Sequence, residues 1–206
     1  MRNKFLATGL IASALLAGLP TAPAAADCKQ EVADAFDRQR KSSAFRMDTR
    51  MINERGPVRM TVDYLLPDRM HQRVKAAIDP AATETILIGK RAWVSGGSGW
   101  QVLLMADALS LAEDMEKTVV KGGGEQPIFD CLGYVQLDGR KLKAYEAMAD
   151  KSAPPGQPTR MVYIDPTTGL PVRSILAQKD KLDRPFFQQD YSYPQDIRIE
   201  PPETAK

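Results

Sequence analysis

Residues 44–78 constrain the fold most, because their apolar side chains recur at every second position in three consecutive segments. This period is that of a β-strand with one buried and one solvated face. Turn residues at 53–57 and at Pro67-Asp68 separate the segments. The pattern therefore predicts an antiparallel meander with one apolar face and one wet face. The three segments are 44–52, 58–66 and 70–78.

The rest of the chain predicts more hairpins and two helices. Apolar residues at helical spacing in 27–41 and 106–120 predict two helices of about fifteen residues each. Two such helices can cover about ten strands only where the sheet is strongly curved. We therefore expect an α+β fold, mainly β, in which one antiparallel sheet forms an incomplete barrel covered by two helices. The further strands are expected at 84–88, 91–95, 100–104, 131–137, 141–149, 159–164, 170–178, 186–193 and 197–199.

Trp93 and Trp100 are expected to lie close together in this sheet. If Ser95 pairs with Trp100 across the glycine-rich turn, the two indoles become diagonal neighbours on one face. Packing in the core or at its rim is favoured over ligand contact for this pair.

The first 26 residues have the order of a secretory signal peptide. A basic start is followed by an apolar run at 5–19 and by small residues at 24–26. The run is too short for a membrane span, which needs roughly 18 apolar residues. We expect cleavage after Ala26, a periplasmic location, one domain at 27–200 and a flexible tail at 201–206.

The two cysteines of the chain are Cys28 and Cys131. An even count in a chain addressed to an oxidising compartment predicts a disulfide. Lipid attachment to Cys28 is the alternative, since lipoprotein leaders end just before a cysteine. Asp27 directly before Cys28 does not fit that cleavage pattern, so the disulfide is favoured.

Charge and composition exclude several classes of function. Without Arg2 and Lys4 of the leader, the 28 basic residues become 26, against 26 acidic ones. A net charge near zero gives no global attraction to nucleic acid. The single histidine, His71, excludes a multi-histidine metal site and leaves a Ser-His-Asp triad only one candidate base. We expect no cofactor, no metal and no catalysis.

The apolar face of the meander is rich in methionine, which adapts to variable apolar ligands but also fills gaps in ordinary cores. From composition alone the ordinary core is favoured, and a ligand cavity is the alternative. The cavity candidates are Phe45, Met47, Met51, Met60, Tyr64, Met70 and Met115. The second helix, with Leu109 on its apolar stripe, and the glycines that follow it suggest a lid with a hinge, although such a run is more often a simple connector. The hinge candidates are Gly122, Gly123 and Gly124.

Three stretches resemble the LolA-like superfamily, which includes a periplasmic lipoprotein carrier, lipid carriers of mycobacterial envelopes and a sensor of envelope stress. In that group a strand followed by Pro-Asp-Arg recurs before an Ile-Leu-rich strand that leads to a tryptophan. The resemblance spans most of the mature chain, in short and degenerate motifs. The stretches are 64–70 (YLLPDRM), 84–93 (ETILIGKRAW) and 191–202 (YSYPQDIRIEPP).

This resemblance implies an unclosed β-barrel whose concave interior holds acyl chains or another hydrophobic ligand. It implies a carrier for a lipid or a lipidated protein, which is our leading hypothesis. The alternative is an envelope sensor or interaction module that binds a membrane-anchored protein. In the lipoprotein carrier, a strand arginine holds the lid closed. The nearest equivalents here, Arg46 and Arg50, belong by alternation to the wet face, so we expect a divergent member of the group.

Overall fold

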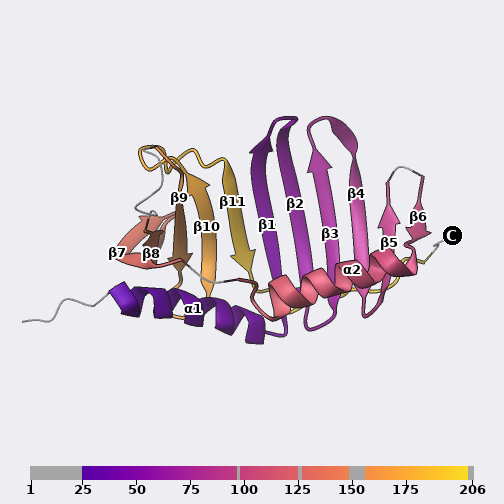
Figure 1. Cartoon of the computed structure of the whole chain (residues 1–206), viewed down its shortest axis with the longest axis horizontal. Coiled ribbons are helices and arrows are strands. Elements are labelled where there is room, and N and C mark those ends of the chain that lie inside the picture. The colour runs from indigo at the N-terminus through magenta and orange to yellow at the C-terminus, as the bar shows by residue number, and fades with distance from the viewer. Residues whose placement is uncertain (1–24, 97, 125–126, 149–155, 204–206) are drawn as a thin grey trace, which may run out of the picture.

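The computed structural model describes residues 25–96, 98–124, 127–148 and 156–203. Within these ranges, eleven strands form one antiparallel sheet in the order β6-β5-β4-β3-β2-β1-β11-β10-β9-β8-β7. The sheet is not closed, and two helices lie along one of its faces (Figure 1). This confirms the expected incomplete barrel. The strands are β1 Ala44–Asn53, β2 Gly56–Leu65, β3 Arg69–Ala76, β4 Asp79–Ile88, β5 Arg91–Ser95, β6 Trp100–Val102, β7 Phe129–Leu137, β8 Arg140–Ala147, β9 Thr159–Ile164, β10 Pro171–Ala177 and β11 Phe187–Ser192.

The helices follow the expected pattern. Helix α1 is Ala25–Lys41, α2 is Met105–Met115, and a π-helical turn η1, Glu116–Val120, continues α2. Ala25 and Ala26, expected in the leader, belong to α1, whereas residues 1–24 lie outside the described part of the chain. None of the described helices has the length and apolar character needed to cross a membrane.

The expected strand at 197–199 is wrong. Strand β11 lies between β1 and β10, so both of its edges are already paired and the chain after it has no nearby edge to join. This segment instead crosses the outer, convex face, where Ile199 is buried against Ile86 and Trp93. The Arg69 guanidinium donates a hydrogen bond to the Ile199 carbonyl oxygen at 3.2 Å.

The sheet has apolar clusters on both faces. On the inner, concave face one cluster lies under α2 and another under α1. The outer face is charged over the meander, as expected, but it also carries apolar clusters over β8–β10 and beneath Ile199. Ser95 pairs with Trp100, as predicted. Trp93 and Trp100 both belong to this last cluster, which confirms that they are diagonal neighbours on one face of the sheet.

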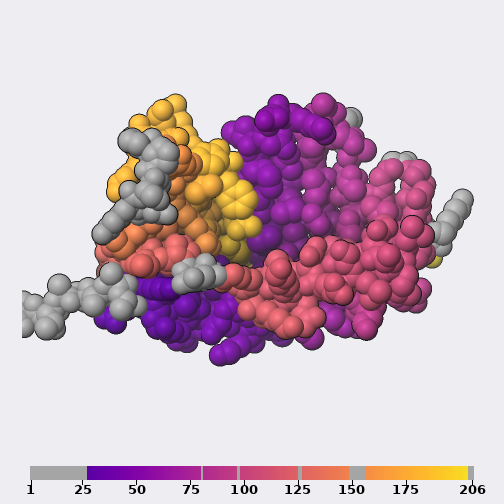
Figure 2. Space-filling view, viewed as in Figure 1, coloured from indigo at the N-terminus to yellow at the C-terminus, as the bar shows by residue number. Residues whose placement is uncertain are grey.

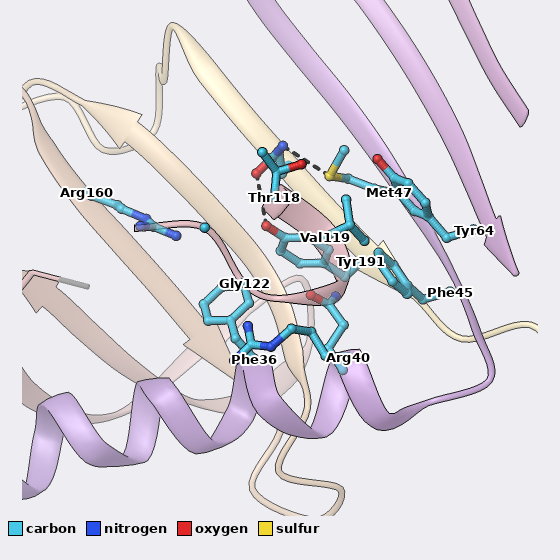
Figure 3. Close-up of a pocket in the computed structure, with 13 residues that line it drawn as sticks. Phe36, Arg40, Phe45, Met47, Tyr64, Thr118, Val119, Gly122, Arg160 and Tyr191 are labelled. Atoms are coloured by element: carbon cyan, nitrogen blue, oxygen red, sulfur yellow. Dashed lines mark hydrogen bonds between the residues drawn. The ribbon is translucent and has the colours of Figure 1, made fainter. Parts of the chain in front are cut away.

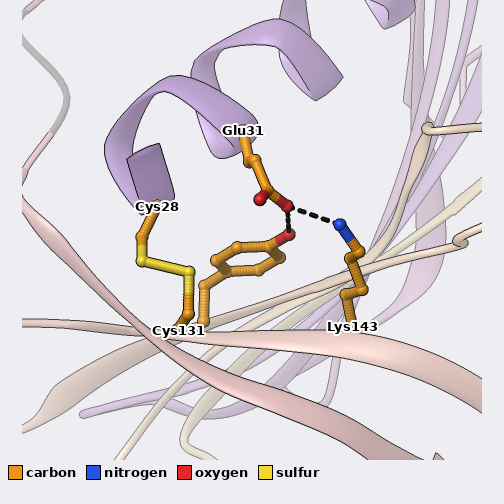
Figure 4. The surroundings of a disulfide bond; sticks show 5 residues. Cys28, Glu31, Cys131 and Lys143 are labelled. Atoms are coloured by element: carbon orange, nitrogen blue, oxygen red, sulfur yellow. Dashed lines mark hydrogen bonds and ion pairs between the residues drawn. A yellow bond between two sulfur atoms is a disulfide. The ribbon is translucent and has the colours of Figure 1, made fainter. Parts of the chain in front are cut away.

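A disulfide joins Cys28 in α1 to Cys131 in β7, as predicted (Figure 4). Beside it, Glu31 of α1 accepts hydrogen bonds from the Tyr145 hydroxyl and from the Lys143 ammonium, the latter at 2.7 Å. These contacts attach α1 to one end of the sheet. The helix then runs along the concave face to the middle of the sheet, where the candidate site lies (Figure 1).

Candidate functional site

The helices cover only part of the concave face. Figure 2 shows α1 and α2 across its lower half, while the upper parts of β1–β4 stay uncovered in this view. Alternation from the buried Phe45 and Tyr64 places four further apolar side chains on this face, each of them partly exposed. The uncovered half is therefore an apolar concave surface. These side chains are Met51, Val58, Met60 and Val74.

A pocket of about 490 Å³ lies at the base of this surface, between α1, η1 and the middle of the sheet (Figure 3). Its volume is within the range of about 300–1,000 Å³ that is usual for small-molecule sites. Residues from several segments far apart in the chain meet here. They are Phe36, Gln39, Arg40, Phe45, Met47, Tyr64, Thr118, Val119, Gly122, Gly123, Arg160, Gln189 and Tyr191.

Aromatic pairs form much of the pocket wall. Phe45 and Tyr64 are opposite each other on β1 and β2, and their rings stack with centroids 4.8 Å apart. Phe36 of α1 meets the Tyr191 ring edge-on at 6.0 Å. Such pairs add roughly 0.5–1.5 kcal/mol beyond the burial of their area. They give the pocket a fixed apolar wall beside the flexible Met47.

About half of the residues that line the pocket carry a polar side-chain group, and several of these groups are hydrogen-bonded to one another. The Tyr191 hydroxyl donates to the Gln189 side-chain carbonyl at 2.9 Å, and the Gln189 amide donates to the Met47 sulfur at 3.1 Å. Burial raises the pKa of Tyr64 and of Tyr191 to about 12 each. Both phenols are therefore neutral at physiological pH and contribute no charge to the pocket.

Two arginines supply the charge. Arg160 of β9 lies over the Phe36 ring, 5.7 Å from its centroid, and its Nε donates to the Ser174 hydroxyl at 3.3 Å. Arg40 of α1 points towards Gly122 and lies very close to its backbone. A Cβ atom added to Gly122 would lie only 2.7 Å from the guanidinium carbon of Arg40. Because Gly122 has a φ of +83° and no side chain, the connector can bend tightly and approach the arginine this closely.

The predicted cavity residues divide into three groups. Phe45, Met47 and Tyr64 line the pocket, whereas Met51 and Met60 lie on the concave face above it. Met70 and Met115 are buried in the cluster beneath α2 and are not among the residues that line this pocket. Around Met70 and Met115 side chains therefore fill the interior, as in the ordinary core that composition favoured, whereas the open pocket lies nearer to α1.

The lid and hinge candidates also have definite positions. Leu109 lines a second pocket, of about 510 Å³, on the far side of α2. Gly122 and Gly123 line the first pocket, and all three glycines have positive φ. The contact face of α2 and η1 with the core consists of Ala108, Leu111, Ala112, Met115 and Val119.

Sequence reasoning did not find Phe36, Arg40, Arg160 or Tyr191 as members of the site. Arg160 did leave a signal, because alternation in 159–164 places it on the same face as Val162 and Ile164. A charged residue on the apolar face of a strand is uncommon and points to a special environment. No comparable feature of the sequence indicated that α1 and η1 would lie close together at this pocket.

The charged residues of the meander assemble on the outer face, away from this pocket. His71 Nε2 lies 2.7 Å from Glu84 Oε2, and Arg73 approaches His71 Nδ1 at 2.9 Å. Asp63, which is buried, accepts hydrogen bonds from Arg46 and Arg73. His71 and Arg73 of β3 are therefore paired with acidic side chains of the neighbouring strands rather than freely solvated. Arg50 pairs with Asp190 on this face, so the expected orientation of Arg46 and Arg50 is confirmed.

The described residues contain no group of three or more histidine, cysteine or acidic side chains that could hold a metal ion. Comparison of the sequence with protein-family models and with curated proteins finds no match. Comparison of the structure does find similar folds. LprF from Mycobacterium bovis is similar over 86% of this chain and 97% of its own, with 14% identity and a TM-score of 0.56.

The chain has a LolA-like fold. This confirms the fold that the resemblance implied. Two other solved structures are similar at lower scores. An uncharacterized conserved protein from Thermus thermophilus has 11% identity and a TM-score of 0.46, over 86% of this chain and 98% of its own. MucB has 17% identity and a TM-score of 0.43, over 87% of this chain and 63% of its own.

The LolA-like sheet explains why the pocket lies where it does. A half-open sheet with helices along only part of its concave face leaves an apolar surface that, in the described part of the chain, neither helix covers. The pocket lies where this surface meets the helical layer, and both α1 and η1 contribute to its lining.

Proposed function

We propose that this protein is a periplasmic binding or carrier protein for a hydrophobic ligand, a lipid or a lipidated protein. In this proposal it works by holding the ligand in the pocket and on the concave face, without chemistry. The observation that carries the proposal is the pocket itself, since a concave site of this volume that combines apolar walls with oriented polar groups is typical of small-molecule sites. The methionines above the pocket suit chains of variable shape.

The size of the apolar interaction is sufficient for useful affinity. Burial of a methylene gains about 0.8 kcal/mol, so about ten methylenes gain roughly 8 kcal/mol before the costs of association are counted. Where other contacts in the pocket offset those costs, a net free energy of about 8 kcal/mol corresponds to a dissociation constant near 1 µM. A carrier needs binding of this moderate strength, because it must also release its ligand.

Two features support the periplasmic part of the proposal. Residues 1–26 have the order of a secretory signal peptide. The disulfide between Cys28 and Cys131 fits an oxidising compartment. Mass spectrometry of the protein purified from its own host tests both, with an N-terminus at Asp27 and a loss of two hydrogens as the expected results.

The binding function is tested by native mass spectrometry and lipid extraction of the same preparation. A variant that fills the pocket should bind less. Thr118→Trp adds a large ring at a residue that lines the pocket, while Lys117→Trp adds the same ring one position earlier, at an exposed residue outside the lining. We expect Thr118→Trp alone to weaken binding of a fluorescent apolar probe about tenfold or more. Absence of co-purified lipid together with absence of probe binding would refute the proposal.

A second candidate function is an interaction module that binds a membrane-anchored protein. The observation that favours it is a group of exposed apolar side chains where β6 leads into α2. Val102, Leu104 and Met105 expose 49%, 75% and 64% of their surface, which is unusual for large apolar residues so close together near a sheet edge. A photo-crosslinker at Leu104 should capture a membrane-anchored protein in the periplasm, and one at the exposed Lys41 should not.

A further inference from the structure

The charged residues among the described lining of the first pocket are both arginines, so their charge is positive. Among the residues that the structure describes, its thirteen lining residues include two arginines and no aspartate or glutamate. Asp37, the acid that pairs with Arg40, is half exposed and does not line the pocket. A ligand in this pocket therefore meets apolar walls together with two guanidinium groups.

The second pocket, on the far side of α2, gives an internal comparison. It has a similar volume, about 510 Å³, but its lining includes Asp68, Glu113 and Glu116 against one cation, Lys90. The two pockets beside the same helical segment therefore carry opposite charge. Cationic lining is a property of the first pocket and not of the concave face in general.

The position of Arg160 makes its charge effective inside the pocket. It enters from the apolar face of β9 and lies against Phe36, so part of its side chain is shielded from water. Burial raises the pKa of Tyr191, and the positive charge of Arg160 acts against this rise. Arg40 approaches the same pocket from α1, so the two guanidinium groups come from different elements on either side of it (Figure 3).

We propose that the pocket selects single-chain amphiphiles with an anionic head group, and that Arg40 and Arg160 bind this head while the aromatic wall holds the chain. The inference rests on the proposed function, whose ligand class it narrows. Guanidinium groups present planar pairs of N–H donors that match the oxygens of a carboxylate or a phosphate. The pocket volume suits one chain and its head group better than a bulky lipid with several chains.

The test uses probes of one chain length and different head groups. Dissociation constants are measured for dodecyl phosphate, dodecanoate, dodecanol and dodecyltrimethylammonium, below their critical micelle concentrations and after removal of co-purified lipid. For the wild type we expect both anions to bind at least about tenfold more tightly than dodecanol, because each charge-assisted hydrogen bond contributes about this much or more. We also expect added salt to weaken binding of the anions more than that of dodecanol.

Three variants test whether Arg40 and Arg160 are the residues that bind the anionic head group. Arg40→Gln and Arg160→Gln should each weaken binding of the anions more than binding of dodecanol, and so remove most of the preference for anions. Lys41→Gln is the matched control, since it removes the same charge from the neighbouring exposed residue of α1, outside the pocket. Far-ultraviolet circular dichroism confirms the fold of each variant. If Arg160→Gln fails to fold, Arg40→Gln alone tests the proposal.

The outcomes separate this inference from the proposed function. Equal binding of all four probes, or preference for the cation, would overturn the inference and leave the binding function standing. The same holds if both arginine variants keep the wild-type preference. If the wild type binds none of the probes, the proposed function fails, and the inference fails with it.

Discussion

Removing the disulfide between Cys28 and Cys131 should destabilise the protein by about 4.7 kcal/mol. The bond joins residues 103 positions apart, so it closes a long loop in the unfolded chain. In the chain-entropy model, a loop of this length lowers the entropy of the unfolded state by about 16 cal/mol/K, which is about 4.7 kcal/mol at 25 °C. Since domains are usually stable by about 5–15 kcal/mol, the loss is a large fraction of the total.

The contribution of the cross-link can be separated from that of the buried sulfur. Cys28 is buried beside Val32 and Phe129, whereas Cys131 is exposed. Reduced wild-type protein keeps the sulfur in the core but lacks the bond, while the double alanine variant lacks both. Urea unfolding monitored by tryptophan fluorescence should therefore show a loss of about 4–5 kcal/mol on reduction and a slightly larger loss in the double variant.

The denaturant dependence gives an independent check. An unfolded chain without the cross-link is more extended and exposes more surface, so the slope of the unfolding free energy against urea should increase on reduction. A loss below about 1 kcal/mol with an unchanged slope would refute the argument. That result would mean that the reduced unfolded chain stays about as compact as the cross-linked one.

Three further substitutions test the sheet itself, each by urea unfolding. Burial raises the pKa of Asp63, but Arg46 and Arg73 lower it by more than burial raises it, so the pKa of Asp63 is below the usual value for an aspartate. The stability from this carboxylate is present above about pH 4 and is lost as the pH falls through the folded-state pKa. Asp63→Asn should therefore cost about 2 kcal/mol at pH 7 and progressively less as the pH falls below about 4; a cost that does not change with pH would contradict this. Ile199→Ala should cost about 2–4 kcal/mol because Ile199 is 2% exposed, whereas truncation after residue 200 should be nearly neutral. Thr49→Val should stabilise the protein by about 1 kcal/mol, because the buried Thr49 hydroxyl has no hydrogen-bond partner among the described groups; a loss of stability would show that it has one.

Local patterns predicted most elements of the fold. The alternation in 44–78 indicated which side of each strand faces the helices, so Phe45 and Tyr64 were correctly placed on the inner face and Arg46 on the outer one. It succeeded because the side-chain period of a strand is two, and a shift of one residue would bury every charge in the segment. The expected strand at 197–199 failed because pairing depends on a free sheet edge, which a local pattern does not reveal.

The candidate site was only partly predictable, because a local pattern does not reveal which distant segments of the chain come together. Phe45, Met47 and Tyr64 were found because they lie on consecutive strands of one hairpin. Arg40, Arg160 and Tyr191 come from segments far apart in the chain. The sheet order places the strands of Arg160 and Tyr191 close together, and the path of α1 across the sheet brings Arg40 to them.

Periodicity and residue type over short ranges were enough to predict nearly all the strands, the two helices and the inner face of the meander. The even cysteine count and the leader predicted the pairing of Cys28 with Cys131. These features could not predict which part of the apolar face is filled and which part is open. That outcome depends on where two helices of limited length lie on a larger curved sheet, which is a property of the folded chain as a whole. The helices bury Met70 and Met115, leave Met51 and Met60 partly exposed, and form with the sheet a pocket that two arginines line.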